Sequence, residues 1–200
     1  MESLTGLDLH GNQLSLDIPT ELSSLVNLAS IALYENQLSG AIPSAFGTMT
    51  QLTSLTLHDN KLSKPIPPDI GKLTLLTELR LHGNRLTGSI PSTFGDLTLL
   101  NDLNLTSSSE YYESKLSGSI PDTLGRLTRL TTFNVSRNAL TGEIPLTLTI
   151  LSSIRSFGFS GNMFSSIPDT WGSDLIHLEL SSNYFYGEIP ATLEILEIMY

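Results

Sequence analysis

Cysteine is absent from the 200 residues of this sequence. Without thiols the chain has no disulfide bonds, no thiolate nucleophile and no zinc site with cysteine ligands, and redox chemistry gives no information on its compartment. Long hydrophobic runs are also missing. Because no stretch of about 18 apolar residues occurs, we expect no membrane span in this chain.

Basic residues are scarce, since ten Lys and Arg stand against twenty Asp and Glu and the net charge is −10. This balance argues against a nucleic-acid partner, because nucleic-acid binding relies on clustered cations. All ten basic residues lie between Lys61 and Arg155, so a weakly positive middle separates two acidic ends. Solubility explains this distribution, and a partner's footprint on the middle of the chain stays open as an alternative.

Catalytic motifs are missing too. The sequence has no nucleophile elbow, no phosphate-binding glycine loop, no HExxH zinc motif and no kinase motif. Ser, His and Asp are abundant, but they recur as positions of a repeat and not as a convergent set. We therefore expect a protein that is not an enzyme and that needs no cofactor.

What the sequence does contain is one unit repeated. Residues 76–99 read LTELRLHGNRLTGSIPSTFGDLTL, and the same residue types return 24 residues upstream. Such self-similarity predicts a solenoid, in which each unit buries its apolar residues against its neighbours. Eight units can be laid end to end, and they begin at Leu4, Leu28, Leu52, Leu76, Leu100, Leu130, Ile154 and Leu175.

Each part of the unit has a physical role. Around Leu79 and Leu81 apolar and polar residues alternate, which predicts a short strand with one buried face. Asn84 follows this strand, where its amide can bond backbone groups of its own turn and of the next. Gly88 suits a bend with positive φ, and Pro91 favours an extended segment leading into a short helical turn on the opposite side.

The dipeptide Ile-Pro recurs in all eight units and the turn asparagine in seven. The pattern LxxLxLxxNxLxGxIPxxLGxLxx resembles the plant-type leucine-rich repeat over nearly the whole chain, from Leu4 to about Ile198. The resemblance implies a single domain over residues 1–200. Its fold class is an α/β-type solenoid, a right-handed coil of about eight repeats with a parallel β-sheet on the concave face and loops or 3-10 turns on the convex side.

The same resemblance implies that the chain is part of the ectodomain of a receptor-like kinase or receptor-like protein. It also implies an extracellular or cell-surface location, which the chain alone does not reveal. Family members usually carry capping segments with paired cysteines. Since this chain has none, we expect it to be uncapped at both ends, with exposed core side chains that allow self-association.

The fifth unit departs from the pattern. It carries an insertion loop at 106–115, and Ser114 stands where asparagine is expected. An insertion just after a strand should lie at the rim of the concave face. Tyr111 and Tyr112 lie in this insertion and are candidate loop contacts, because tyrosine is favoured in recognition surfaces. A tolerated surface loop is the alternative.

Outward-pointing strand residues should align in columns along the concave face. The first five units place imidazole, phenol and charged groups in these columns, whereas the later units carry mainly small hydroxyls and glycine. We therefore expect a ligand to favour the first five units. The predicted contacts are Asp8, His10, Tyr34, Glu35, His58, Asp59, Glu78, Arg80, His82 and Asp102.

Histidines on adjacent units raise two further hypotheses. His58 and His82 lie near Asp59, a combination that can bind a metal ion. Because parallel columns diverge, we expect no metal site; a pH-sensitive patch is an alternative to ordinary solvated positions. Two N-x-S/T sequons begin at Asn104 and Asn134, at the same strand position in adjacent units, and are candidate N-glycosylation sites.

The sequence therefore predicts a recognition module whose concave face binds a protein or peptide ligand. Rigid presentation of aligned side chains would keep the ordering cost of binding low. Two alternatives stay open. One is a self-associating scaffold, and the other, suggested only by the family resemblance, is an inhibitor of a secreted hydrolase.

Overall fold

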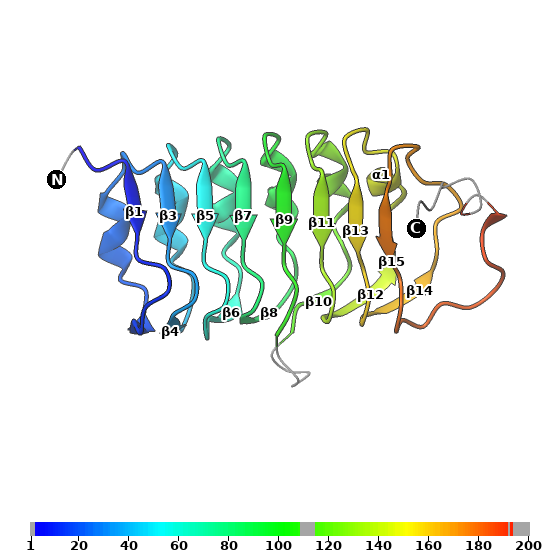
Figure 1. The fold of residues 1–200 in the computed structure, drawn as a ribbon, viewed down its shortest axis with the longest axis horizontal. Helices are drawn as coiled ribbons and strands as arrows, with labels where there is room; N and C mark the ends of the chain where they lie inside the picture. Colours follow the sequence, from blue (N-terminus) through cyan, green and yellow to red (C-terminus); the bar gives the residue numbers. More distant parts are fainter. Residues whose placement is uncertain (1–2, 109–114, 192, 194–200) are drawn as a thin grey trace.

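The computed structural model describes residues 3–108, 115–191 and 193. These residues form a solenoid in which one short strand from each turn joins a single parallel sheet of eight strands (Figure 1). In spatial order, which is also chain order, the strands are β1 (Gly6–Asp8), β3 (Ser30–Ala32), β5 (Ser54–Thr56), β7 (Glu78–Arg80), β9 (Asp102–Asn104), β11 (Thr132–Asn134), β13 (Ser156–Gly158) and β15 (His177–Glu179). The predicted solenoid fold is thus confirmed.

The central residue of each strand points into the interior. Leu79 pairs with Leu55 on one side and Leu103 on the other, and all three side chains are fully buried. Leu81 is also buried, whereas Arg80 between them lies at the surface and is only partly covered. One hydrophobic cluster runs from Ile18 to Leu175. The alternation in the sequence therefore identified the buried face of the strands correctly.

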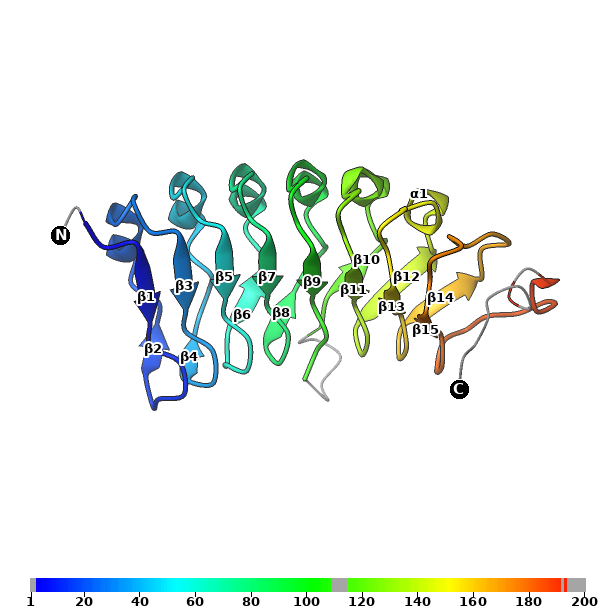
Figure 2. The same cartoon turned by 45° about the horizontal axis from the view of Figure 1, so that its top comes forward.

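Short helical turns line the opposite side of the coil (Figure 2). They are the 3-10 helices η1 (Thr20–Ser24), η2 (Ser44–Thr48), η3 (Pro68–Lys72), η4 (Ser92–Asp96) and η6 (Asp122–Arg126), and the single-turn helix α1 (Leu146–Thr149). A proline precedes each of them in extended conformation, as Pro91 does at φ −63° and ψ 130°. The fixed φ of proline thus keeps the residue before each helical turn extended, as the sequence predicts.

Glycine lets these helical turns stack closely. A Cβ built on Gly47 of η2 would lie 2.6 Å from the Asp69 carbonyl oxygen of η3, closer than real Cβ contacts allow. One turn further on, a Cβ built on Gly71 would likewise lie 2.5 Å from the Thr93 carbonyl oxygen. Any larger residue would force neighbouring turns apart, so the spacing of the stack depends on these glycines.

Short parallel ladders also form at the bend between the strands and the helical turns. They pair β2 (Ser15–Asp17) with β4 (Gln37–Ser39), β6 (Ser63–Pro65) with β8 (Arg85–Thr87), and β12 (Ala139–Glu143) with both β10 (Ser117–Gly118) and β14 (Met163–Ser166). Gly88, just after β8, has φ 72°, which confirms the positive φ predicted at this bend. Leu16 and Lys64 adopt φ 72° and 75° without being glycine.

The turn asparagines form a buried ladder. Asn60 Nδ2 donates to the carbonyl oxygens of Leu57 and His58 in its own turn and of Leu33 in the preceding turn, and its Oδ1 accepts from the Leu38 N–H. Asn36, Asn84, Asn138 and Asn162 repeat the arrangement. Their amides bridge successive turns, as predicted from their spacing.

The ladder is interrupted in the fifth unit. By chain register Ser108 occupies the asparagine position there, but its hydroxyl donates to the Asn84 carbonyl oxygen at 3.4 Å and its side chain is exposed. A cavity of about 10 Å³ lies beside the interruption, between Leu86 and Leu116. Ser114, at the position counted back from Leu116, lies outside the described residues.

Aromatic residues fill the interior of the last turns. Phe157 and Phe159 stack at 5.1 Å, and the Trp171 indole packs against both of them, at 5.7 Å and 6.4 Å between ring centroids. Trp171 thus packs against the core.

On the first turn Leu4 and Leu9 remain 36% and 40% exposed. Among the described residues, no helix has the length and apolar character needed to cross a membrane.

Candidate ligand-binding face

The outward residues of the eight-stranded sheet, with the turn residues that follow each strand, form the surface that we call the strand face. It corresponds to the concave face of the prediction. The strand register aligns one column along it as expected: Asp8, Ala32, Thr56, Arg80, Asn104, Asn134, Gly158 and Glu179. Side chains from turns 21, 24 or 30 residues apart in sequence therefore become neighbours.

Four rings of the next column stack on one another. His10, Tyr34, His58 and His82 lie with successive centroids 4.4, 4.4 and 4.5 Å apart and with planes inclined by only 8° to 15°. Because successive strands of a sheet lie roughly 4.8 Å apart, rings at the same position of adjacent turns match the strand spacing. The stack is a continuous aromatic strip over the first four turns.

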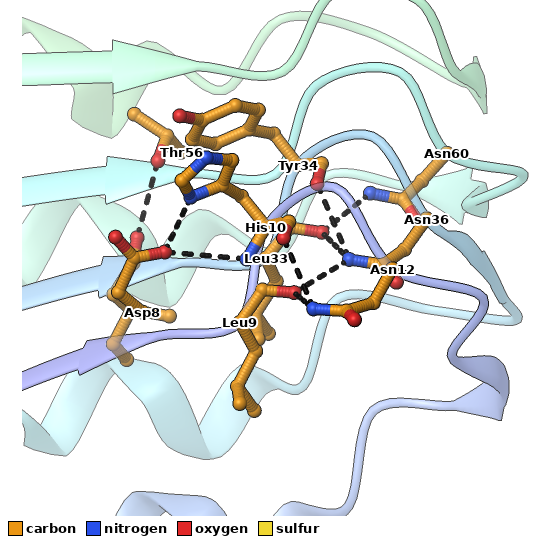
Figure 3. Close-up of polar contacts among 10 residues, drawn as sticks. Asp8, Leu9, His10, Asn12, Leu33, Tyr34, Asn36, Thr56 and Asn60 are labelled. Carbon is orange, nitrogen blue, oxygen red and sulfur yellow. Dashed lines mark hydrogen bonds and ion pairs between the residues drawn. The ribbon is translucent and has the colours of Figure 1, made fainter.

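A carboxylate holds the first ring of the stack. Asp8 Oδ1 lies 2.6 Å from His10 Nδ1 and also accepts from the His10 backbone N–H at 3.2 Å (Figure 3). The hydrogen bond to the His10 side chain is the main cause that lowers the pKa of Asp8. Figure 3 also shows the Tyr34 ring next to the His10 ring and, beside them in the turn, the Asn12 amide donating to the Leu9 carbonyl oxygen and the Asn36 amide donating to that of Tyr34.

The two central histidines lack such a partner. The Nδ1 atoms of His58 and His82 are buried and have no hydrogen-bond partner. Burial lowers the pKa of both imidazoles because it penalises the charged form, and the neighbouring Arg80 lowers it further. Asp59 opposes these effects. Both rings are therefore neutral at pH 7.

The charged residues of β7 and β9 form one ion-paired group. Arg80 Nε lies 3.1 Å from a Glu78 carboxylate oxygen and 2.9 Å from Asp102. The Ser54 hydroxyl donates to the other oxygen of Glu78 at 2.8 Å. The guanidinium is therefore neutralised by two carboxylates, and the group as a whole keeps one negative charge.

Glu35 and Asp59 occupy the turn after their strands and are exposed. Both have left-handed backbone, with φ 53° and 52°, at a position where Gly11 and Gly83 stand in other turns. Non-glycine residues in this region carry a steric cost, so the two carboxylates are held at the rim of the strand face by a constrained backbone.

Four other predicted residues, the two loop tyrosines and the two sequon asparagines, belong neither to the ring stack nor to the ion-paired group. Tyr111 and Tyr112 lie outside the described residues. The Asn104 side chain accepts from the backbone N–H and the hydroxyl of Thr106, while Asn134 accepts from the Ser136 N–H. Both sequon asparagines thus lie on the fifth and sixth strands, beyond the ring stack.

Sequence reasoning missed two features of the strand face. The stacking of the four rings depends on side-chain rotamers, and only their shared position in the repeat hinted at it. The last strand, β15, also carries a histidine–carboxylate pair, because His177 Nε2 lies 3.0 Å from Glu179 Oε1. The C-terminal half is therefore not made of small hydroxyls and glycine alone.

These features define a repeat solenoid that presents an aligned polar face on a parallel sheet. Residues 4–185 match the family described as the leucine-rich repeat region. The chain belongs to this family. A comparison with curated protein sequences finds no match.

Solved structures of plant receptors are similar over nearly the whole chain. The Arabidopsis receptor kinase HAESA, in complex with the peptide hormone IDA and the co-receptor SERK1, is 38% identical over 98% of this chain and 33% of its own, with a TM-score of 0.89. The plant peptide hormone receptor RGFR1, in complex with RGF2, is 31% identical over 98% of this chain and 31% of its own, with a TM-score of 0.91.

A plant ice-binding protein is also similar, at 31% identity and a TM-score of 0.86, over 99% of this chain and 63% of its own. The chain thus spans about a third of the length of the two receptor chains. The similarity therefore concerns the repeat array, and one array serves proteins of different functions.

Proposed function

We propose that this chain is the recognition module of a cell-surface receptor-like protein, and that its strand face binds a peptide or protein ligand without catalysis. The observation that carries the proposal is the ring stack flanked by charged residues on the first five turns. The similarity to receptors whose structures contain peptide hormones supports it. A face fixed by a continuous sheet binds at a low entropic cost.

The charge of the strand face favours a cationic ligand. Its only guanidinium among the predicted contacts, on Arg80, is already paired with two carboxylates. Among the same predicted contacts the acidic side chains outnumber it, and they are Asp8, Glu35, Asp59, Glu78 and Asp102. Complementary charge speeds association and excludes wrong partners, so binding should weaken as the salt concentration rises.

A displayed library of random 12-residue peptides, selected on the purified chain, tests the proposal without knowledge of the natural ligand. Two strand-face variants and two matched controls then locate the binding surface. Tyr34→Ser removes one ring and introduces a residue that the same column carries at Ser136. Its control, Tyr184→Ser, removes a tyrosine that is 68% exposed outside the strand face.

Asp59→Asn removes a carboxylate and keeps a residue that tolerates left-handed backbone. Its control, Asp69→Asn, lies in η3 on the opposite side, where Asp69 pairs with Lys72. We expect selected peptides to be rich in Lys and Arg and to lose about tenfold or more in affinity with Tyr34→Ser. Peptides that bind all four variants equally well would contradict the proposal.

A further inference from the structure

Three side chains with metal-binding atoms converge at the centre of the strand face. His58 and Asp59 follow β5, and His82 follows β7 in the adjacent turn. One potential ligand atom from each residue lies within 4.8 Å of the other two. The turn after β5 places the Asp59 carboxylate against Gly83, beside the imidazoles, and this is what brings the three side chains together.

The two imidazoles are available for a new ligand, unlike the other two histidines of the chain. His10 and His177 are each held by a carboxylate, at 2.6 Å and 3.0 Å. The Nδ1 atoms of His58 and His82 are buried with no hydrogen-bond partner. Turning these two rings breaks no hydrogen bond at Nδ1, although it changes the stacking contacts of the two rings with each other and of His58 with Tyr34.

Some movement of the rings is required. A tetrahedral zinc ion binds nitrogen at about 2.0–2.1 Å, which places its ligand atoms roughly 3.4 Å apart. The His58 and His82 rings are stacked at 4.5 Å with planes only 15° apart, so their in-plane lone pairs are nearly parallel. Each ring must therefore turn about its Cβ–Cγ bond until the two lone pairs point at one ion.

Charge around the site favours a cation. His58 interacts electrostatically with Asp59 and Glu35, and His82 with Asp59 and Asp102. Arg80 is the opposing positive charge. Two imidazoles and one carboxylate form a donor set that suits zinc, copper or nickel and not calcium or magnesium, which prefer oxygen ligands.

We propose that His58, His82 and Asp59 bind a divalent transition-metal ion of the zinc class on the strand face. Three protein ligands leave one position of a tetrahedral ion free, as in zinc sites that also bind water or an external group. The site lies beside Tyr34 within the ring stack. It does not depend on whether the strand face binds a peptide.

Isothermal titration of the chelator-treated chain with Zn²⁺ at pH 7.5 tests the site. We expect saturable binding of about one ion per chain with a micromolar dissociation constant, and a tetrahedral cobalt spectrum when Co²⁺ replaces Zn²⁺. His82→Thr and His58→Thr, which introduce the residue that this column carries at Thr106, should each weaken binding by about tenfold or more. Asp59→Asn should weaken it less, because Asn keeps an oxygen donor.

His177→Thr is the matched control, since it removes a histidine from the same face but outside the site. It should leave the affinity unchanged. Proton NMR of the unaltered chain gives a second readout, because Zn²⁺ should shift the ring signals of His58 and His82 before those of His177. The proposal is overturned if no saturable binding occurs up to millimolar Zn²⁺, if His177→Thr weakens binding equally, or if both site variants bind as the unaltered chain does.

Discussion

At the scale of single residues, equivalent positions of the repeat differ in backbone strain, because some carry glycine and others do not. Lys64 has φ 75°, whereas Gly40 and Gly88, one repeat before and after it, have φ 70° and 72°. A Cβ in left-handed backbone costs of the order of 1 kcal/mol, which glycine avoids. We expect Lys64→Gly to raise the free energy of unfolding by up to about 1 kcal/mol, measured by urea denaturation.

Lys61 is the matched control, because it is exposed, of the same type and only three residues away, and its φ is not positive. Lys61→Gly should lower the free energy of unfolding by about 0.5–1 kcal/mol, since glycine there adds freedom to the unfolded chain and removes the exposed hydrogen bond from Lys61 Nζ to Gln37 Oε1. Equal destabilisation by both substitutions would contradict the assignment of strain to Lys64.

The central histidines make stability depend on pH. Folding lowers the pKa of His58 and His82 below the ordinary value of 6.5, chiefly through burial. Between that value and the lower folded pKa, the unfolded chain binds more protons than the folded chain. Stability is therefore fully present above about pH 6.5 and falls as the pH drops through this window. We expect a lower melting temperature at pH 5.5 than at pH 7.5.

The double variant His58→Thr/His82→Thr should show a smaller difference between the two pH values. Asp8 and Asp69 also have a lowered pKa, but from an ordinary value of 3.8, so they act only in more acidic solution. If the double variant loses as many degrees as the unaltered chain, the two imidazoles are not the cause.

At the scale of elements, the asparagine ladder joins one turn to the next. Asn60 forms four hydrogen bonds, and those to Leu33 and Leu38 reach the preceding turn. Removing the amide leaves the buried Leu38 N–H without its acceptor, at about 1–3 kcal/mol, whereas the three carbonyl oxygens each keep a second donor. We expect Asn60→Ala to lower the free energy of unfolding by about 2 kcal/mol in urea denaturation.

Asn12 offers the comparison within the same chain. It is exposed on the first turn and donates only to the Leu9 and His10 carbonyl oxygens of its own turn. Asn12→Ala should therefore cost no more than about 1 kcal/mol. A similar loss for Asn12→Ala and Asn60→Ala would show that bonds between turns contribute little.

Most of the elements could be predicted from the sequence, because the same residue types recur at the same positions of eight units and so assign each position to a strand, a turn or a helical turn. The alternation around Leu79 and Leu81 fixed the buried face of a strand, and the proline before each helical turn fixed its start. The pairing of Arg80 with two carboxylates could not be predicted, because it depends on which rotamers long side chains adopt. The same holds for the stacked rings.

At the scale of the whole molecule, continuity of the core determines what the strand face can do. The buried cluster extends from Ile18 to Leu175, and each strand of the eight-stranded sheet pairs with the next without a shift in register. A face held in this way presents its side chains in fixed order along the sheet. The ligand binding that we propose for the first five turns would therefore require no folding of this face, in contrast to a loop-based site.

Hydroxyl-radical footprinting of the chain, free and bound to a peptide selected as above, tests the central claim most directly. The rings on the strand face and the exposed tyrosines near the last strand both react with the radical, so one experiment reports on two surfaces. The account predicts that the peptide protects Tyr34 and His58 and leaves Tyr184 and Tyr186 unchanged. Protection of Tyr184 and Tyr186, with Tyr34 and His58 still fully reactive, would contradict it.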